Sequence, residues 1–345
     1  MEPKHSVHPS RLYNIDFLRI VFTLCIFFCH AGGRLNIVSY ASFSVEFFFI
    51  LSGFFLTFTI EHQINLQNFV LKKIIRFLPL LLFGQFVCNL ITRTFSTPKI
   101  LSLIFFLPST GLSKNNHCSV GTAWYVCVLL WISVFYFYTI KTQKKATTNV
   151  ITGIIIFSGC IIYNMLPQRP LQHLFPESML RGFICMGLGY FLALIYQSEF
   201  FRKFQLSNSS VRYFIFISIL EFWLVTYLSA LMFVPEEFKT DYIHIVILFL
   251  LLAYLFLQKR GFISTFFDDS SWSKISKYCL SFFLTHQIIT DYLYYKWHFF
   301  ANLSVPISFT VMLGLSIVLA VFAYHCVEQP AYKYLKRLTE DKSSE

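Results

Sequence analysis

The sequence predicts an all-α membrane protein, a polytopic bundle of about ten transmembrane helices with both termini in the cytoplasm. Only 13% of the residues are charged and 56% are hydrophobic, whereas soluble domains have about 25% charged residues. The apolar residues form blocks of about 20, which is the length of helix that spans a bilayer. The basic residues gather between alternate blocks, as the loops of a membrane protein do.

Ten apolar segments are expected to cross the membrane, and residues 1–345 are expected to form one membrane domain with no appended soluble domain. The expected spans lie near 14–33, 43–61, 77–95, 119–140, 149–166, 178–197, 211–233, 241–257, 276–296 and 304–326. The stretch 99–108 is too short to cross and ends in Pro108, so we expect a short interfacial segment there.

The basic residues also set the expected orientation, because short cytoplasmic loops are enriched in Lys and Arg. With the N-terminus inside, 19 of the 28 Lys and Arg residues fall on the cytoplasmic side, eight fall on the outer side, and Arg19 lies within the first span. The net charge of +11 is therefore spread over many short loops rather than gathered in one stripe. This distribution argues against nucleic acid as a partner and favours a multi-pass protein of the plasma (inner) membrane, in contact with its lipids.

The cysteines carry no metal or disulfide signal. Eight of the nine lie in apolar blocks, only Cys118 lies in a polar loop, and no Cys-x-x-Cys pair occurs. We expect them to be small buried side chains, and we expect neither a bound metal nor a disulfide framework.

The first span contains two ionisable side chains on one face. Arg19 and His30 are eleven residues apart, which is three helical turns plus roughly 20° and roughly 16 Å along the axis. Asp16 precedes Arg19 by three residues, a spacing that lets the two pair. Because an arginine facing lipid near mid-bilayer costs at least about 2.5 kcal/mol, this face is expected to line a polar cavity. A histidine near its ordinary pKa can accept a proton from a hydroxyl or briefly carry an acyl group.

Three stretches of sequence are familiar in combination. "NIDFLRIVFTLCIFFCHAGG" is followed by "SVEFFFILSGFFL" and then by "KKIIRFLPLLL". They resemble the acyltransferase 3 family of integral membrane acyltransferases, whose marks are Arg-x10-His, Gly-Val-Asp/Glu-Phe-Phe-x-x-Ser-Gly and Arg-x-x-Arg-hydrophobic-x-Pro. The chain departs from these marks in having Ser44 in place of glycine and Lys73 in place of the first arginine of the third motif. Looser matches follow at Trp124-Tyr125, at "SFFLTHQII" and at the closing Glu328-x-Pro330.

The resemblance implies an enzyme that moves an acyl group, commonly acetyl, from cytoplasmic acyl-CoA to a hydroxyl of a sugar or lipid-linked glycan of the cell surface. It implies a catalytic role for His30, Arg19 and Glu46 and donor binding by Arg76, Lys73 and Lys72. Further cavity or substrate residues are expected at Asp16, Ser52, Trp124, Tyr125 and His286. Glu46 is expected either to orient His30 or to bind the acceptor.

Other interpretations of the same residues stay open. Ser52-Gly53 is also a small pair suited to close helix packing, the cluster at residues 72–76 also fits plain cytoplasmic retention of charge, and His286 also fits a satisfied interior histidine. A transporter or flippase would use Asp16, Arg19 and Glu46 to bind a polar or lipid-linked substrate or to couple to protons. A glycan polymerase or ligase is disfavoured, because the longest expected outer loop, about 96–118, is modest.

Overall fold

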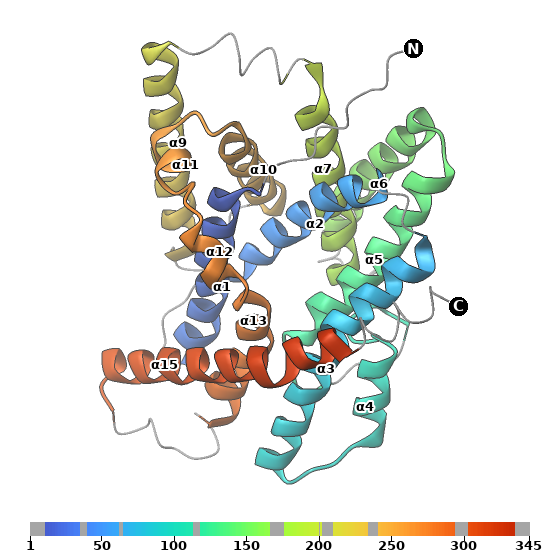
Figure 1. The fold of residues 1–345 in the computed structure, drawn as a ribbon, viewed down its shortest axis with the longest axis vertical. Helices are drawn as coiled ribbons and strands as arrows, with labels where there is room; N and C mark the ends of the chain where they lie inside the picture. The colour runs from blue at the N-terminus through green and yellow to red at the C-terminus, as the bar shows by residue number, and fades with distance from the viewer. Residues whose placement is uncertain are drawn as a thin grey trace.

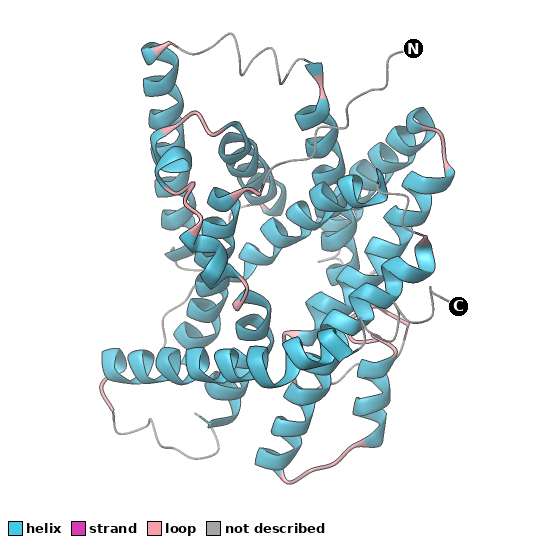
Figure 2. Cartoon of the chain, viewed as in Figure 1, coloured by secondary structure: helices cyan, strands magenta, loops and turns pink. Residues whose placement is uncertain are grey.

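A computed structural model of the chain describes residues 11–34, 40–61, 65–112, 118–165, 176–199, 201, 210–233, 241–293 and 303–334. All regular secondary structure in these ranges is helical (Figure 2). Eight of the described helices are long and apolar enough to cross a membrane. The polytopic helical bundle predicted from the sequence is therefore confirmed, while both chain ends lie outside the described residues.

Most of the expected spans match observed helices closely. These helices are α1 (Tyr13–Arg34), α2 (Ser44–Glu61), α5 (Ala123–Thr142), α6 (Lys145–Met165), α7 (Glu177–Gln197), α9 (Val211–Phe233), α10 (Tyr242–Gln258) and α15 (Val305–Ala323). The short α4 (Thr97–Ile104) occupies the place of the expected interfacial segment. A 3-10 turn, η1 (Tyr40–Phe43), leads into α2, and the π-helical η4 (Tyr324–Glu328) follows α15.

The third helix begins earlier than the sequence predicts. α3 (Leu66–Thr92) starts where the Asn65 side chain accepts a hydrogen bond from the backbone N–H of Asn68 at 2.8 Å, which satisfies one of the first unpaired amides of the helix. The basic residues 72–76 therefore belong to this helix, whereas the expected span near 77–95 placed them in the preceding loop. The helix continues through Pro79.

The ninth expected span, 276–296, is not one continuous helix. The chain forms α12 (Ser271–Ser276), then α13 (Cys279–Gln287), and then the π-helical η3 (Ile288–Leu293). The short α11 (Phe262–Phe266) precedes α12. α15 lies crosswise to α1 in the lower half of the view and packs on α13 (Figure 1). π-helical turns are rare and are frequently found at functional sites, and this one directly follows the residues described below.

Two glycines let α2 and α7 pack closely in the centre of the bundle. A Cβ atom at Gly53 would lie 2.1 Å from the Met186 carbonyl oxygen, and one at Gly189 would lie 2.0 Å from the Ile50 carbonyl oxygen. Because small residues allow helix backbones to approach in a membrane protein, the packing interpretation of Gly53 is confirmed. These two helices also carry residues of the candidate site, Glu46 and Ser52 on α2 and Arg181 on α7.

Candidate active site

Arg19 of α1 is surrounded by residues of other helices. Arg19 is about one-third exposed, with 38% of its side chain accessible, yet it lies among other helices. Its guanidinium lies over the Phe55 ring of α2, with 5.6 Å between the guanidinium carbon and the ring centroid. It is also within electrostatic range of Arg76 on α3, Tyr125 on α5 and Cys279 on α13. Arg19 therefore lies among side chains of four other helices.

Asp16 joins Arg19 to the start of the chain. Its Oδ1 lies 3.4 Å from Nη1 of Arg19, and its Oδ2 lies 3.2 Å from Nε of Arg11. The pairing expected from the spacing of Asp16 and Arg19 is confirmed. A carboxylate bound by two arginines leaves a net positive charge at this end of α1.

The basic residues of α3 differ in their surroundings. Arg76 is exposed, but it lies within electrostatic range of Arg19, Glu328 and Tyr332. Lys73 is half-buried, with its Nζ 5.2 Å from the ring centroid of Phe69. Lys72 is exposed. The structure thus brings Arg76 together with Arg19 and places Lys73 beside aromatic rings of its own helix.

Ser52 of α2 and Tyr125 of α5 lie close to each other, and Tyr125 is within electrostatic range of Arg19. The Ser52 hydroxyl donates to the Phe48 carbonyl at 2.7 Å and is also within hydrogen-bonding reach of the Tyr125 side chain. Tyr125 is buried, with 7% of its surface exposed. This hydroxyl pair and the two arginines form one polar cluster near the first half of α1.

His30 lies against α13 near the other end of α1. The Gln287 amide nitrogen lies 3.1 Å from Nδ1 of His30 and 3.4 Å from its Nε2. The His286 ring follows, with its centroid 5.2 Å from that of His30. Arg19 lies within electrostatic range of Cys279, and His30 lies beside Gln287. Both side chains are therefore on the side of α1 toward α13, as the helical spacing predicts.

His286 is fully buried, and its hydrogen-bonding capacity is only half used. Its Nδ1 lies 3.1 Å from the Phe282 carbonyl oxygen, so Nδ1 carries the proton and Nε2 carries the lone pair. Within the described part of the chain, Nε2 has no hydrogen-bond partner. The ring stacks on Phe282, with the ring planes 13° apart. His286 thus combines an apolar contact, its stacking on Phe282, with one acceptor atom, Nε2, that is unpaired among the described residues, and its ring lies beside the His30 ring.

Glu46 makes its ion pair with α7. Its Oε1 lies 2.5 Å from Nε of Arg181, and its side chain is fully buried. The Arg181 guanidinium also lies over the rings of Trp124, at 5.3 Å, and Phe43, at 5.6 Å. Within the described residues, the carboxylate is bound by Arg181 and not by His30, so the contacts do not support the expectation that Glu46 orients His30.

Sequence reasoning missed two residues of this region. Arg181 is one of the eight basic residues that the sequence analysis places on the outer side. It lies within the expected span 178–197, and such a charge inside a span itself suggests a partner. Gln287 stands next to His286 in "SFFLTHQII" and was not assigned a role. Its position beside a candidate histidine is the one feature of the sequence that could have pointed to Gln287. Its hydrogen bond joins it to His30, 257 positions away, and no local sequence pattern predicts such a contact.

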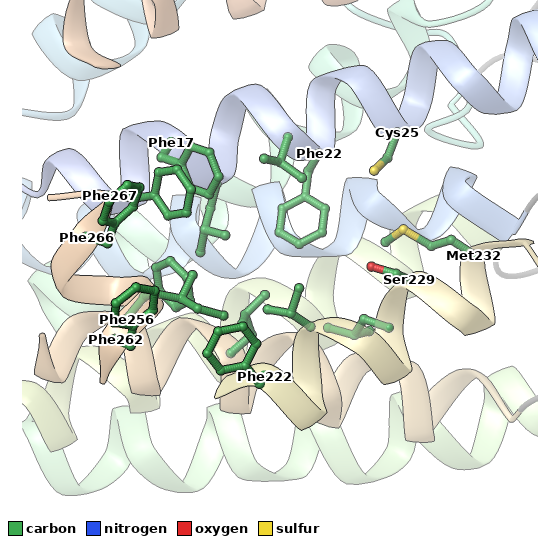
Figure 3. Close-up of a pocket in the computed structure, with 16 residues that line it drawn as sticks. Phe17, Phe22, Cys25, Phe222, Ser229, Met232, Phe256, Phe262, Phe266 and Phe267 are labelled. Carbon is green, nitrogen blue, oxygen red and sulfur yellow. The ribbon is translucent and has the colours of Figure 1, made fainter. Parts of the chain in front are cut away.

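The other face of α1 borders an apolar pocket of about 320 Å³. Figure 3 shows Phe17, Phe22 and Cys25 of α1 opposite Phe222, Ser229 and Met232 of α9, with Phe256 of α10 and Phe262 of α11 nearby. This pocket contains neither Arg19 nor His30. Because its lining is almost wholly apolar, we place the chemistry on the polar face toward α13.

Fold and site together define a polytopic membrane protein with an arginine and a histidine on one interior helix face. The model of the acyltransferase 3 family, an acyltransferase domain, matches residues 12–325. The chain belongs to this family and is a membrane acyltransferase. No curated protein and no solved structure matches the chain at a significant level.

Proposed function

We propose that the protein is a plasma-membrane O-acyltransferase that moves an acyl group, most simply acetyl, from cytoplasmic acyl-CoA to a hydroxyl of a cell-surface glycan. The acyl group is not an aminoacyl group, and the acceptor is a sugar or lipid-linked glycan such as an O-antigen, capsule or exopolysaccharide. The observation that carries the proposal is the family match together with Arg19 and His30 facing one helix, α13.

The arginine end of this face suits the donor. Arg19 and Arg76 come within electrostatic range of each other, and two like charges held together favour an anion between them. A guanidinium fits phosphate oxygens with two parallel hydrogen bonds. In the proposal Arg76 and Arg19 bind the phosphates of CoA, Lys73 and Lys72 add positive charge at the cytoplasmic entrance, and Ser52 and Tyr125 line the path of the thioester arm.

The histidine end suits the chemical step. The acceptor hydroxyl oxygen attacks the thioester carbonyl carbon, its proton passes to the His30 imidazole, and the carbon–sulfur bond breaks to release the CoA thiolate. The proton then passes from His30 to the thiolate. If His30 carries the acyl group instead, its nitrogen attacks the thioester first and the hydroxyl attacks the acyl-imidazole next. No metal is required for either route.

The ion pair between Glu46 and Arg181 suits acceptor binding. The second carboxylate oxygen of Glu46 is buried and has no partner in the described part of the chain, and Trp124 is half-buried beside Arg181. Carboxylates accept hydrogen bonds from sugar hydroxyls, and an indole ring offers an apolar face. We therefore propose an acceptor-binding role for Glu46, Arg181 and Trp124.

The test is the acetylation of surface glycan in cells that express single variants at normal abundance. We expect His30→Ala to lower transfer by about 10²–10⁴-fold, the usual contribution of a positioned proton acceptor, so that acetyl signals vanish from the NMR spectrum of the glycan. Arg19→Ala should weaken the use of acyl-CoA. The matched control is His244→Ala, because His244 is an exposed histidine of α10 whose partner is Tyr227.

Normal acetylation in the His30→Ala variant would remove this mechanism. The purified protein separates the enzyme from a transporter or flippase. Transfer of labelled acetyl from acetyl-CoA to glycan supports the acyltransferase, whereas movement of glycan across vesicles with no need for CoA would support the transporter.

A further inference from the structure

We propose that Gln287 is a positioning residue that holds His30 in its neutral form, ready to accept a proton. The inference rests on the proposed function for its meaning, but not for its test. It starts from the fact that one buried amide connects three segments that lie far apart in the sequence, the end of α1, the beginning of α5 and the end of α13.

The orientation of the Gln287 amide is fixed by α5. The backbone N–H of Thr122 lies 2.6 Å from Oε1 of Gln287. A backbone N–H can only donate, so the atom facing it must be the amide oxygen. The amide nitrogen consequently points at the His30 ring.

This orientation of the amide determines which protonation state of His30 can form the hydrogen bond. The amide nitrogen of Gln287 is a donor and not an acceptor, so a ring nitrogen of His30 must accept its hydrogen bond. An imidazolium has N–H groups at both nitrogens and accepts nothing. Gln287 therefore favours the neutral imidazole over the charged one.

The surroundings of the Gln287 amide are tightly packed. Gln287 is buried, with 6% of its surface exposed. A Cβ atom at Gly121 would lie 2.6 Å from Oε1 of Gln287, so a glycine is needed where the amide meets α5. The π-helical turn of η3 begins at the next residue, Ile288, so Gln287 is the last residue of α13.

The described titratable groups near His30 lie on the elements packed against it. On α13 the neighbour is His286, whose Nδ1 donates to the Phe282 carbonyl and which is buried and apolar in its surroundings. On η3 the titratable group with a described side chain is Asp291, which accepts from Thr290. α15 has no ionisable side chain, and on α1 itself Cys29 directly precedes His30 and lies near Ser42. The amide of Gln287 lies within hydrogen-bonding distance of the ring nitrogens.

The test measures the protonation of His30 without any substrate. Diethyl pyrocarbonate modifies neutral imidazole and not imidazolium, so the rate of modification against pH gives a midpoint for each histidine. Trypsin releases residues 20–34, which contain His30 as their single histidine, and residues 278–296, which contain His286 as theirs. Mass spectrometry of the purified full-length protein in detergent therefore reports both midpoints.

The decisive variant is Gln287→Glu. A carboxylate still accepts from the Thr122 N–H, but it stabilises the imidazolium instead of the neutral ring. An opposite charge within about 4–6 Å moves a titration by about 1–3 units, so we expect the His30 midpoint to rise by at least about one pH unit. Gln287→Leu removes the donor and adds no charge, so its rise should be smaller. Gly121→Ala, which displaces the amide without changing it, should also raise the midpoint.

The control is Gln85→Leu. Gln85 is a buried amide of α3 that binds the backbone N–H of Ser119 at 2.9 Å, so this variant loosens the same loop without touching His30, and the midpoint should stay at the wild-type value. An unchanged His30 midpoint in the folded Gln287→Glu protein overturns the proposal. So does an equal shift in Gln85→Leu, because the effect would then be structural.

The acid limb of the acetylation rate adds a second readout. With Gln287→Glu, we expect this limb to move to higher pH by the same amount as the modification midpoint. If the midpoint shifts but the wild-type protein never transfers acetyl, the result supports the role of Gln287 and contradicts the proposed acyltransferase function. If the midpoint of His30 modification stays unchanged while transfer is normal, the result contradicts the role of Gln287 and supports the proposed acyltransferase function.

Discussion

At the scale of single residues, the interior of this bundle stabilises charge by pairing. Glu46 and Arg181 are both removed from water, with side-chain exposures of 0% and 14%. Burying either charge alone carries a large desolvation cost, and the partner offsets much of it. Arg19 is also paired, with Asp16 at 3.4 Å, but it lies within electrostatic range of the like charge of Arg76. This proximity of two positive charges is why we assign anion binding to the arginines and a fixed ion pair to Glu46.

The pairing of Glu46 with Arg181 gives a prediction for stability. Either Glu46→Leu or Arg181→Leu leaves one buried charge without its partner, so each should destabilise the protein by about 3–5 kcal/mol. The double variant removes both charges and should recover most of that loss. Thermal unfolding in detergent, followed by dye binding to exposed cysteines, measures the order of the midpoints. A double variant that is less stable than both single variants would contradict the ion-pair explanation.

Sequence reasoning reached part of this residue-scale description. The shared face of Arg19 and His30 and the pairing of Asp16 with Arg19 follow from helical spacing alone, because both relations lie within one helix. The partners of Glu46 and His30 lie 135 and 257 positions away. Tertiary packing sets such contacts, and a single sequence contains no periodicity that encodes them.

At the scale of elements, the length of apolar segments predicts helices well and their interruptions poorly. The bounds of α9 agree with the predicted 211–233, because a long apolar block has one way to satisfy its backbone in a bilayer. The predicted start of α3 is too late because the basic residues Lys72, Lys73 and Arg76 are typical of a cytoplasmic loop, although Asn65 caps a helix ahead of them. The break between α12 and α13 and the π-helical η3 lie within an apolar block that gave no sign of them.

The contact between α2 and α7 gives a prediction at this scale. Gly53→Val and Gly189→Val should separate the two helices, because each added side chain would meet backbone atoms that cannot move independently. We expect lower yields of folded protein and a lower unfolding midpoint. Gly153→Val and Gly314→Val are matched controls, since open space surrounds a Cβ atom at either position. Equal losses in the controls would show that helix propensity, not packing, explains the effect.

At the scale of the whole molecule, the broken segment from α12 to η3 decides the topology. Ten crossings with both ends in the cytoplasm require this segment to span the membrane, although its described residues form α12, α13 and η3 rather than one long α-helix. The geometry supports a crossing, because α13 lies beside α1 from the neighbourhood of Arg19, near Cys279, to that of His30, near Gln287. These two levels of α1 are roughly 16 Å apart along the helix axis.

Reporter fusions test this crossing directly. Alkaline phosphatase is active only outside the cytoplasm, and green fluorescent protein expressed through this route fluoresces only inside it. We expect a phosphatase fused after residue 270 to be inactive, one fused after residue 301 to be active, and a fluorescent protein fused to the C-terminus after residue 345 to fluoresce. If the segment turned back without crossing, the positions after 301 and 345 would exchange sides while the position after 270 stayed inside. That outcome would leave nine crossings, would contradict the excess of basic residues predicted for the cytoplasmic side, and would place His30 beside a re-entrant segment rather than a spanning one.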